Sequence, residues 1–170
     1  RKVDNSVNEL LDGPTLDASA LAGKIQRLHI FFSLLIPDMS HEEKQLLDEA
    51  LIKTYARKGI THKNESLTDP QHPEQYKKMP ILEDVYNVLL ESEDTKRLAH
   101  ILNRLVHGSA SSFNQQTNVD LTNKYTVLDI SELTGSSDLL TVGMFVALDY
   151  VWAKAKENRT EEKAIFVDEV

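Results

Sequence analysis

Four amphipathic helical patterns follow one another before residue 109, and this succession restricts the fold more than any other feature of the chain. In the first pattern the apolar residues recur three or four positions apart: Leu21, Ile25, Leu28, Phe32 and Leu35. Such spacing is typical of a helix that buries one face. The other three patterns lie at about residues 40–58, 81–90 and 95–106. Because no strand separates them, we expect these helices to pack on one another in a helical layer.

Local signals set the expected helix ends. Asp17 or Ser19 would cap the first helix, and Pro37 would end it. Ser40 with Glu43 three residues later is a capping-box pattern, and Gly59 suits the stop of that second helix. The apolar side of the second helix would carry Leu46, Leu47, Ala50, Leu51 and Tyr55. Gly108 would stop the fourth helix.

Residues 60–80 are polar, contain three prolines and show no apolar period. About twenty residues without secondary structure are unusual in a compact domain. Two interpretations stay open, a short helix near residues 74–77 or a surface loop.

The pattern changes after residue 108. Residues 109–123 have the composition of a loop, and Tyr125–Leu128 form a short β-type run that ends at Asp129. An apolar helix follows at about residues 138–157, with apolar residues on several sides, which predicts burial on more than one side. A second β-type run covers residues 164–167. Strand, helix and strand in this order predict a right-handed parallel βαβ unit. The expected fold class is therefore α/β but helix-dominated.

Composition narrows the classes of function. The chain has 170 residues, no cysteine and a net charge of −8. These values fit one ordinary globular domain in a reducing compartment and exclude disulfides and thiolate metal sites. No apolar run approaches the roughly 18 residues of a membrane helix. The six histidines match no metal-ligand spacing, and His62 and His72 read as solvated loop residues.

The last strand ends on two carboxylates, Asp168 and Glu169. In an open α/β sheet, groups at the carboxyl ends of strands face the ligand crevice. An Asp there can hold a Mg²⁺-bound water, and an adjacent Glu can orient or deprotonate the water that attacks a phosphate. The alternative is a strand that leaves the core through two solvated acids. Asp129 has a similar place after the first strand, although such an Asp more often caps a turn.

No phosphate-cradling Gly-x-x-x-x-Gly-Lys-Ser/Thr loop occurs in the sequence. The polar run Gly108–Ser112 lacks its lysine and reads as a helix stop. The chain alone is therefore not expected to hydrolyse a nucleotide. Because it ends on the acidic pair, we also expect a piece of a longer protein, with exposed apolar surface and either dimerisation or partial disorder around residues 124–170.

A family resemblance rests on four stretches, residues 123–133, 140–152, 158–160 and 164–169, and on Met79–Tyr86 in the helical part. They resemble the conjugative-transfer (type IV secretion) traffic ATPases of the Tra type. That family has a RecA-like P-loop domain with a helical insertion between Walker A and Walker B. The resemblance implies an entry segment at 1–16, a helical insertion subdomain at 17–108 and part of a P-loop NTPase core at 109–170.

The same resemblance implies roles and partners. Glu169 would be the catalytic Glu, and Asp168 the cofactor-binding residue that holds Mg²⁺ through water. ATP and Mg²⁺ would be the cofactors of the full-length ATPase, with no tight binding by this chain alone. The partners would be other subunits in a ring, a hexamer by analogy, and the conjugation machinery. The location would be cytoplasmic, at the inner face of the bacterial membrane.

Two other functions compete with an ATPase fragment. The four amphipathic helices and loop 60–80 also suit a protein-interaction module of a transfer apparatus without catalysis of its own. A nucleic-acid binder is disfavoured by the net charge of −8, although Lys53, Arg57 and Lys58 form a small basic group.

Overall fold

The computed structural model describes residues 19–116, 125–130, 133, 135–157, 160 and 162–168. Two compact units divide the chain, one up to residue 117 and one from residue 118. The predicted entry segment 1–16 lies outside the described residues.

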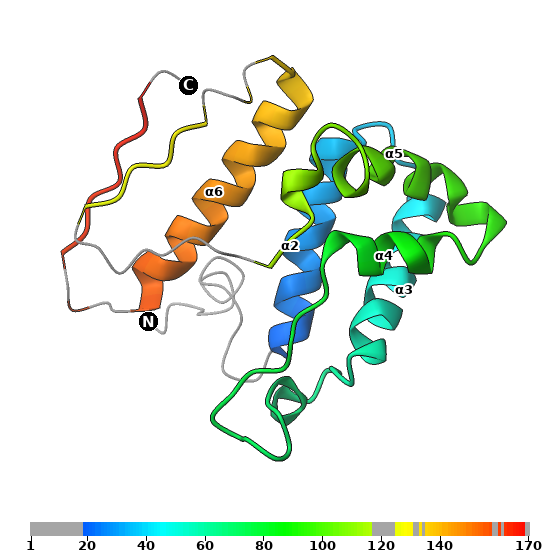
Figure 1. Cartoon of the computed structure of the whole chain (residues 1–170), viewed down its shortest axis with the longest axis horizontal. Helices are drawn as coiled ribbons and strands as arrows, with labels where there is room; N and C mark the ends of the chain where they lie inside the picture. The colour runs from blue at the N-terminus through cyan, green and yellow to red at the C-terminus, as the bar shows by residue number, and fades with distance from the viewer. Residues whose placement is uncertain are drawn as a thin grey trace, which may run out of the picture. The chain divides into compact units, whose positions relative to one another are not determined.

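The first described elements of this unit are two helices, α2 and α3, which are joined by a short connection (Figure 1). Helix α2 spans Ala20–Leu35, and Ser19 caps it by accepting a hydrogen bond from the Ala22 N–H at 3.1 Å. Helix α3 spans His41–Arg57. Its capping box is present, because Ser40 Oγ accepts from the Glu43 N–H and a Glu43 carboxylate oxygen accepts from the Ser40 N–H. The cap prediction at Ser40 and Glu43 is therefore confirmed.

Two further helices complete this unit. Helix α4 spans Leu82–Leu89 and helix α5 spans Lys96–Val106, with a 3-10 turn at Glu93–Thr95 between them. A second 3-10 turn follows at Ser111–Phe113. Side chains from all four helices are fully buried and form one hydrophobic core. Among them are Phe32, Leu47, Leu51, Leu89, Leu98, Leu102 and Leu105. The predicted helix-on-helix layer is confirmed.

Gly59 ends α3 with a φ of +69°, a conformation that favours glycine, as predicted for a helix stop. Residues 60–80, which follow Gly59, do not form the short helix that one interpretation placed near residues 74–77. The short helix lies at Asn64–Leu67, as a 3-10 turn, and not at 74–77. Thr68 and Tyr76 form an antiparallel bridge, so the second half of the loop doubles back on itself. The turn at 64–67 depends on a contact distant in sequence, because Asn64 Oδ1 accepts from the Ala20 N–H at 2.9 Å.

The second unit contains one long helix, α6, at Ser137–Glu157. The helix predicted at 138–157 is thus confirmed, but its predicted burial on several sides is wrong. Leu139 and Val142 are its buried apolar residues among those described, whereas Trp152 is 57% exposed. No described helix has the length and apolarity needed to cross a membrane.

The βαβ unit does not appear among the described residues. The runs 125–130 and 162–168 carry no strand assignment, and Figure 1 draws them as traces without arrows, in yellow and red. A strand is defined by ladder hydrogen bonds to a neighbour. Both runs have β-type composition without such a ladder, so the expectation of two strands is not met here.

Candidate functional site

The predicted acidic site lies at the end of the run 162–168. Asp168 is exposed there, whereas Glu169 lies outside the described residues. Asp129, which ends the other run, is also exposed. Within the described part of the chain no three His, Asp or Glu side chains gather in a way that could hold a metal ion. One carboxylate is still compatible with Mg²⁺, because that ion keeps several waters and binds through one or two carboxylates and substrate phosphates.

Lys163 links the run 162–168 to α6. Its ammonium donates to the Ala155 carbonyl at 3.0 Å, and that carbonyl belongs to the last turn of the helix. The last four carbonyls of a helix have no partner within the helix. A lysine at this place therefore stabilises the helix end and holds the run beside it.

The two runs flanking α6 present apolar side chains to solvent. Phe166 is 90% exposed and Tyr125 is 83% exposed. Val127, Leu128, Ile165 and Val167 are exposed as well. The predicted exposure of apolar surface around residues 124–170 is confirmed. Such a gathering of aromatic and β-branched side chains is typical of a surface that another element covers.

The small basic group of the helical unit is neutralised. Lys53 and Arg57 pair with Glu91 at 2.8 and 2.6 Å, and Lys58 pairs with Asp84 at 2.9 Å. Burial would raise the pKa of Asp84, but the Ile81 N–H and the Lys58 ammonium hold that pKa below its ordinary value. Lys53 and Arg57 thus connect α3 to the segment just after α4, and Lys58 connects the end of α3 to α4 itself. Because these cations are paired with carboxylates, the structure gives no support to a phosphate-binding face at this group.

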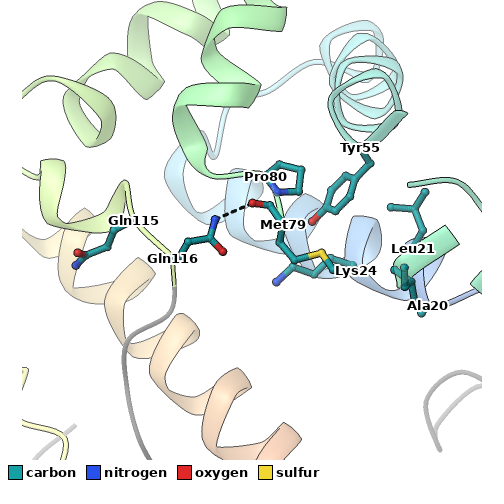
Figure 2. A pocket seen from close by; sticks show the side chains of 9 residues that line it. Ala20, Leu21, Lys24, Tyr55, Met79, Pro80, Gln115 and Gln116 are labelled. Atoms are coloured by element: carbon teal, nitrogen blue, oxygen red, sulfur yellow. Dashed lines mark hydrogen bonds between the residues drawn. The ribbon is translucent and has the colours of Figure 1, made fainter. Parts of the chain in front are cut away.

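A cavity of about 410 Å³ lies within the helical unit, and sequence reasoning did not predict it. Figure 2 shows its lining, which comes from the start of α2, the end of α3, loop 60–80 and the segment after α5. The lining residues are Ala20, Leu21, Lys24, Tyr55, Leu67, Met79, Pro80, Gln115 and Gln116. No local pattern could reveal it, because four separate segments meet there.

Hydrogen bonds fix the walls of this cavity. Gln116 Nε2 donates to the Met79 carbonyl at 2.7 Å, which holds the segment after α5 against the end of loop 60–80. Tyr55 lies largely buried at the cavity wall, and this burial raises the pKa of its hydroxyl to about 12. The hydroxyl therefore stays protonated at neutral pH and can donate a hydrogen bond.

We compared the chain with known proteins to find which of them share this architecture. The chain matches no protein-family model and no curated protein sequence. Among solved structures it is similar to VirB4 of Thermoanaerobacter pseudethanolicus, with a TM-score of 0.74 and 26% sequence identity. The predicted resemblance is confirmed. The chain is thus similar to VirB4, a type IV secretion ATPase, over 86% of its own length, and it spans 55% of the length of that VirB4 chain.

Proposed function

We propose that this chain is part of an ATP-hydrolysing motor for type IV secretion. The similarity to VirB4 over 86% of the chain carries the proposal. The helical unit then corresponds to an insertion, and residues 125–168 to a piece of the nucleotide-binding core. The work of the motor would be conjugative DNA transfer or secretion at the inner face of the bacterial membrane, in a ring of subunits.

The second unit supports this assignment through its exposed apolar runs. Side chains such as Phe166 and Val127 suit the interior of a sheet, where helices cover both faces. We propose that both runs become strands when they pair with neighbouring strands of the core. Strand residues buried on two faces are apolar and β-branched, as these are.

In such a sheet Asp168 and Glu169 would follow a strand at the edge that faces the nucleotide. Asp168 would hold Mg²⁺ through a water ligand, and Glu169 would orient the attacking water. When bound, Mg²⁺ supplies charge neutralisation at the phosphates. The sequence has no Gly-x-x-x-x-Gly-Lys-Ser/Thr loop, so the proposal assigns the phosphate-binding loop to a part of the ATPase other than these residues.

The test is the substitution Glu169→Gln in the full-length ATPase. We expect retained ATP binding and a loss of turnover of roughly 10²–10⁴-fold, the usual contribution of a general base. The matched control is Glu162→Gln, which removes an exposed carboxylate from the same run and should leave turnover unchanged. Full turnover in the Glu169 variant would remove the catalytic assignment. An absence of hydrolysis in the unmodified full-length protein would favour the interaction module.

A further inference from the structure

Tyr55 places a polar group in the wall of the cavity of the helical unit. This residue is only 5% exposed, and it lines the cavity together with residues from other segments (Figure 2). The Tyr55 hydroxyl makes no hydrogen bond within the described part of the chain. A buried polar group without a partner costs stability, so such groups in folded proteins are normally paired with protein, water or a ligand.

The hydroxyl of Tyr55 opens onto the cavity. Among the described residues, every fully enclosed side-chain nitrogen or oxygen atom has a hydrogen-bond partner. Since the Tyr55 hydroxyl has none, it is not fully enclosed and must be reached from the cavity that the residue lines. Figure 2 shows it directed toward Met79 and Lys24. The cavity therefore offers one unused hydrogen-bond donor.

Gln116 offers the complementary group. Its Nε2 donates to the Met79 carbonyl at 2.7 Å, which fixes the direction of the amide. The amide oxygen Oε1 has no hydrogen bond in the part of the chain that the structure describes. A ligand that accepts from the Tyr55 hydroxyl and donates to the Gln116 oxygen would satisfy both groups.

The rest of the lining selects a neutral ligand with an apolar body. Leu21, Leu67, Met79 and Pro80 are apolar. Because a methionine thioether makes favourable contacts with aromatic rings, a flat ring suits the wall at Met79. Lys24 is the one charged side chain among the described residues of the lining, and it already interacts with another group. A charged ligand would therefore lose its water without gaining a free partner.

We infer that this cavity binds a small, neutral aromatic ligand that carries a hydrogen-bond acceptor for Tyr55 and an N–H donor for Gln116. A carboxamide on an aromatic ring has this pattern. The cavity volume of about 410 Å³ lies within the usual range for ligand pockets, roughly 300–1,000 Å³. The ligand would contact the start of α2, the end of α3 and the segment after α5 at once. This inference does not depend on the proposed ATPase function.

Methyl NMR of the whole 170-residue chain tests the inference, with benzamide as the probe. Met79 lines the cavity, whereas Met39 is buried at the connection between α2 and α3 and serves as an internal control. The labelled methyl signals are assigned with Met79→Leu and Met39→Leu. We expect benzamide to shift the Met79 signal saturably, with a dissociation constant roughly in the millimolar range for so small a ligand, and to leave the Met39 signal unchanged.

Two matched probes and one variant separate the contributions. Benzoate has the shape of benzamide but carries a charge, and we expect it to bind at least about tenfold more weakly. Toluene keeps the ring and has no acceptor. In Tyr55→Phe, benzamide binding should weaken roughly 2- to 12-fold, the usual effect of one hydrogen bond, whereas toluene binding should be unchanged. An unchanged affinity for toluene also shows that the cavity of the variant is intact.

Several results would overturn the inference. One is the absence of a saturable shift at Met79, or an equal shift at Met39. Another is equal benzamide affinity in Tyr55→Phe and the wild-type protein, because the hydroxyl would then take no part in binding. Equal losses for benzamide and toluene would contradict it as well, since the variant would then have changed the shape of the cavity. Benzoate binding as tight as that of benzamide would rule out a site for neutral ligands.

Discussion

Thr95 connects the end of α4 to the start of α5, and replacing it by valine tests how these two helices are held. Its hydroxyl Oγ1 donates to the Leu89 carbonyl at 2.5 Å and lies 3.1 Å from the Ser92 carbonyl. Leu89 is the last residue of α4, so its carbonyl has no partner within that helix. Thr95 itself is only 5% exposed. The hydroxyl therefore satisfies a buried carbonyl that water cannot easily reach.

The substitution Thr95→Val keeps the shape of the side chain and removes the donor. A buried acceptor left without a partner costs about 1–3 kcal/mol. For a chain of this size each kcal/mol corresponds to about 2–4 °C in Tm, so we expect Tm to fall by roughly 2–12 °C. Far-UV circular dichroism during heating and urea unfolding measures the change.

Thr95→Ser is the matched control, because it keeps the donor and removes one buried methyl group, worth about 0.8 kcal/mol. We expect the serine variant to lie between the wild-type protein and the valine variant. A valine variant as stable as the wild-type protein, beside a destabilised serine variant, would refute the reasoning. The methyl group would then stabilise the junction and the hydrogen bond would contribute nothing.

Two further predictions concern the helix ends of the same unit. Gly108→Ala should lower the free energy of unfolding by about 1–3 kcal/mol in the same unfolding assay. The reason is that an added Cβ would lie 2.8 Å from two backbone atoms of Arg104, the Cα and the carbonyl oxygen. A variant as stable as the wild-type protein would show that this backbone can shift at no cost. Glu43 has a pKa below its ordinary value, through the Ser40 N–H first and then Arg97. The Glu43 carboxylate stabilises the folded protein fully at pH values above the ordinary pKa of a glutamate side chain. This stabilisation is lost as the pH falls through the lowered pKa that Glu43 has in the folded protein. Tm should therefore fall more steeply between about pH 5 and pH 3 in the wild-type protein than in Glu43→Gln, whereas parallel curves would contradict this.

The elements that sequence reasoning predicted correctly depend on neighbours in sequence. Ser40 and Glu43 satisfy each other's backbone within one turn, so their pattern alone indicates the start of α3. Gly59 likewise needs only its own φ of +69° to end that helix. The four helices of the first unit followed from periodicity, because each buries one continuous face.

Loop 60–80 shows why the remaining structure was not predictable in the same way. Its turn at 64–67 depends on the bond from the Ala20 N–H, 44 positions away, and its return depends on Lys77, which donates to the Gly59 carbonyl at 2.8 Å. Neither partner can be identified from the local pattern. The cavity beside this loop was missed for the same reason, since its wall combines four segments.

In the second unit the sequence predicted more burial of apolar side chains than the described residues show. A helix with apolar residues on several sides is normally buried. In α6, however, Val146, Leu148 and Trp152 are between 41% and 57% exposed. The flanking runs expose Phe166 and Tyr125 to an even greater extent. Apolar burial contributes about 25 cal/mol per Å², so a sheet that covered these side chains would add substantial stability. Among the described residues the two predicted strands do not appear and α6 is not buried on several sides, and a neighbouring strand is the element that would satisfy both expectations. The second unit therefore exposes side chains that suit a further covering element, and under the proposed function that element would be a strand of the nucleotide-binding core.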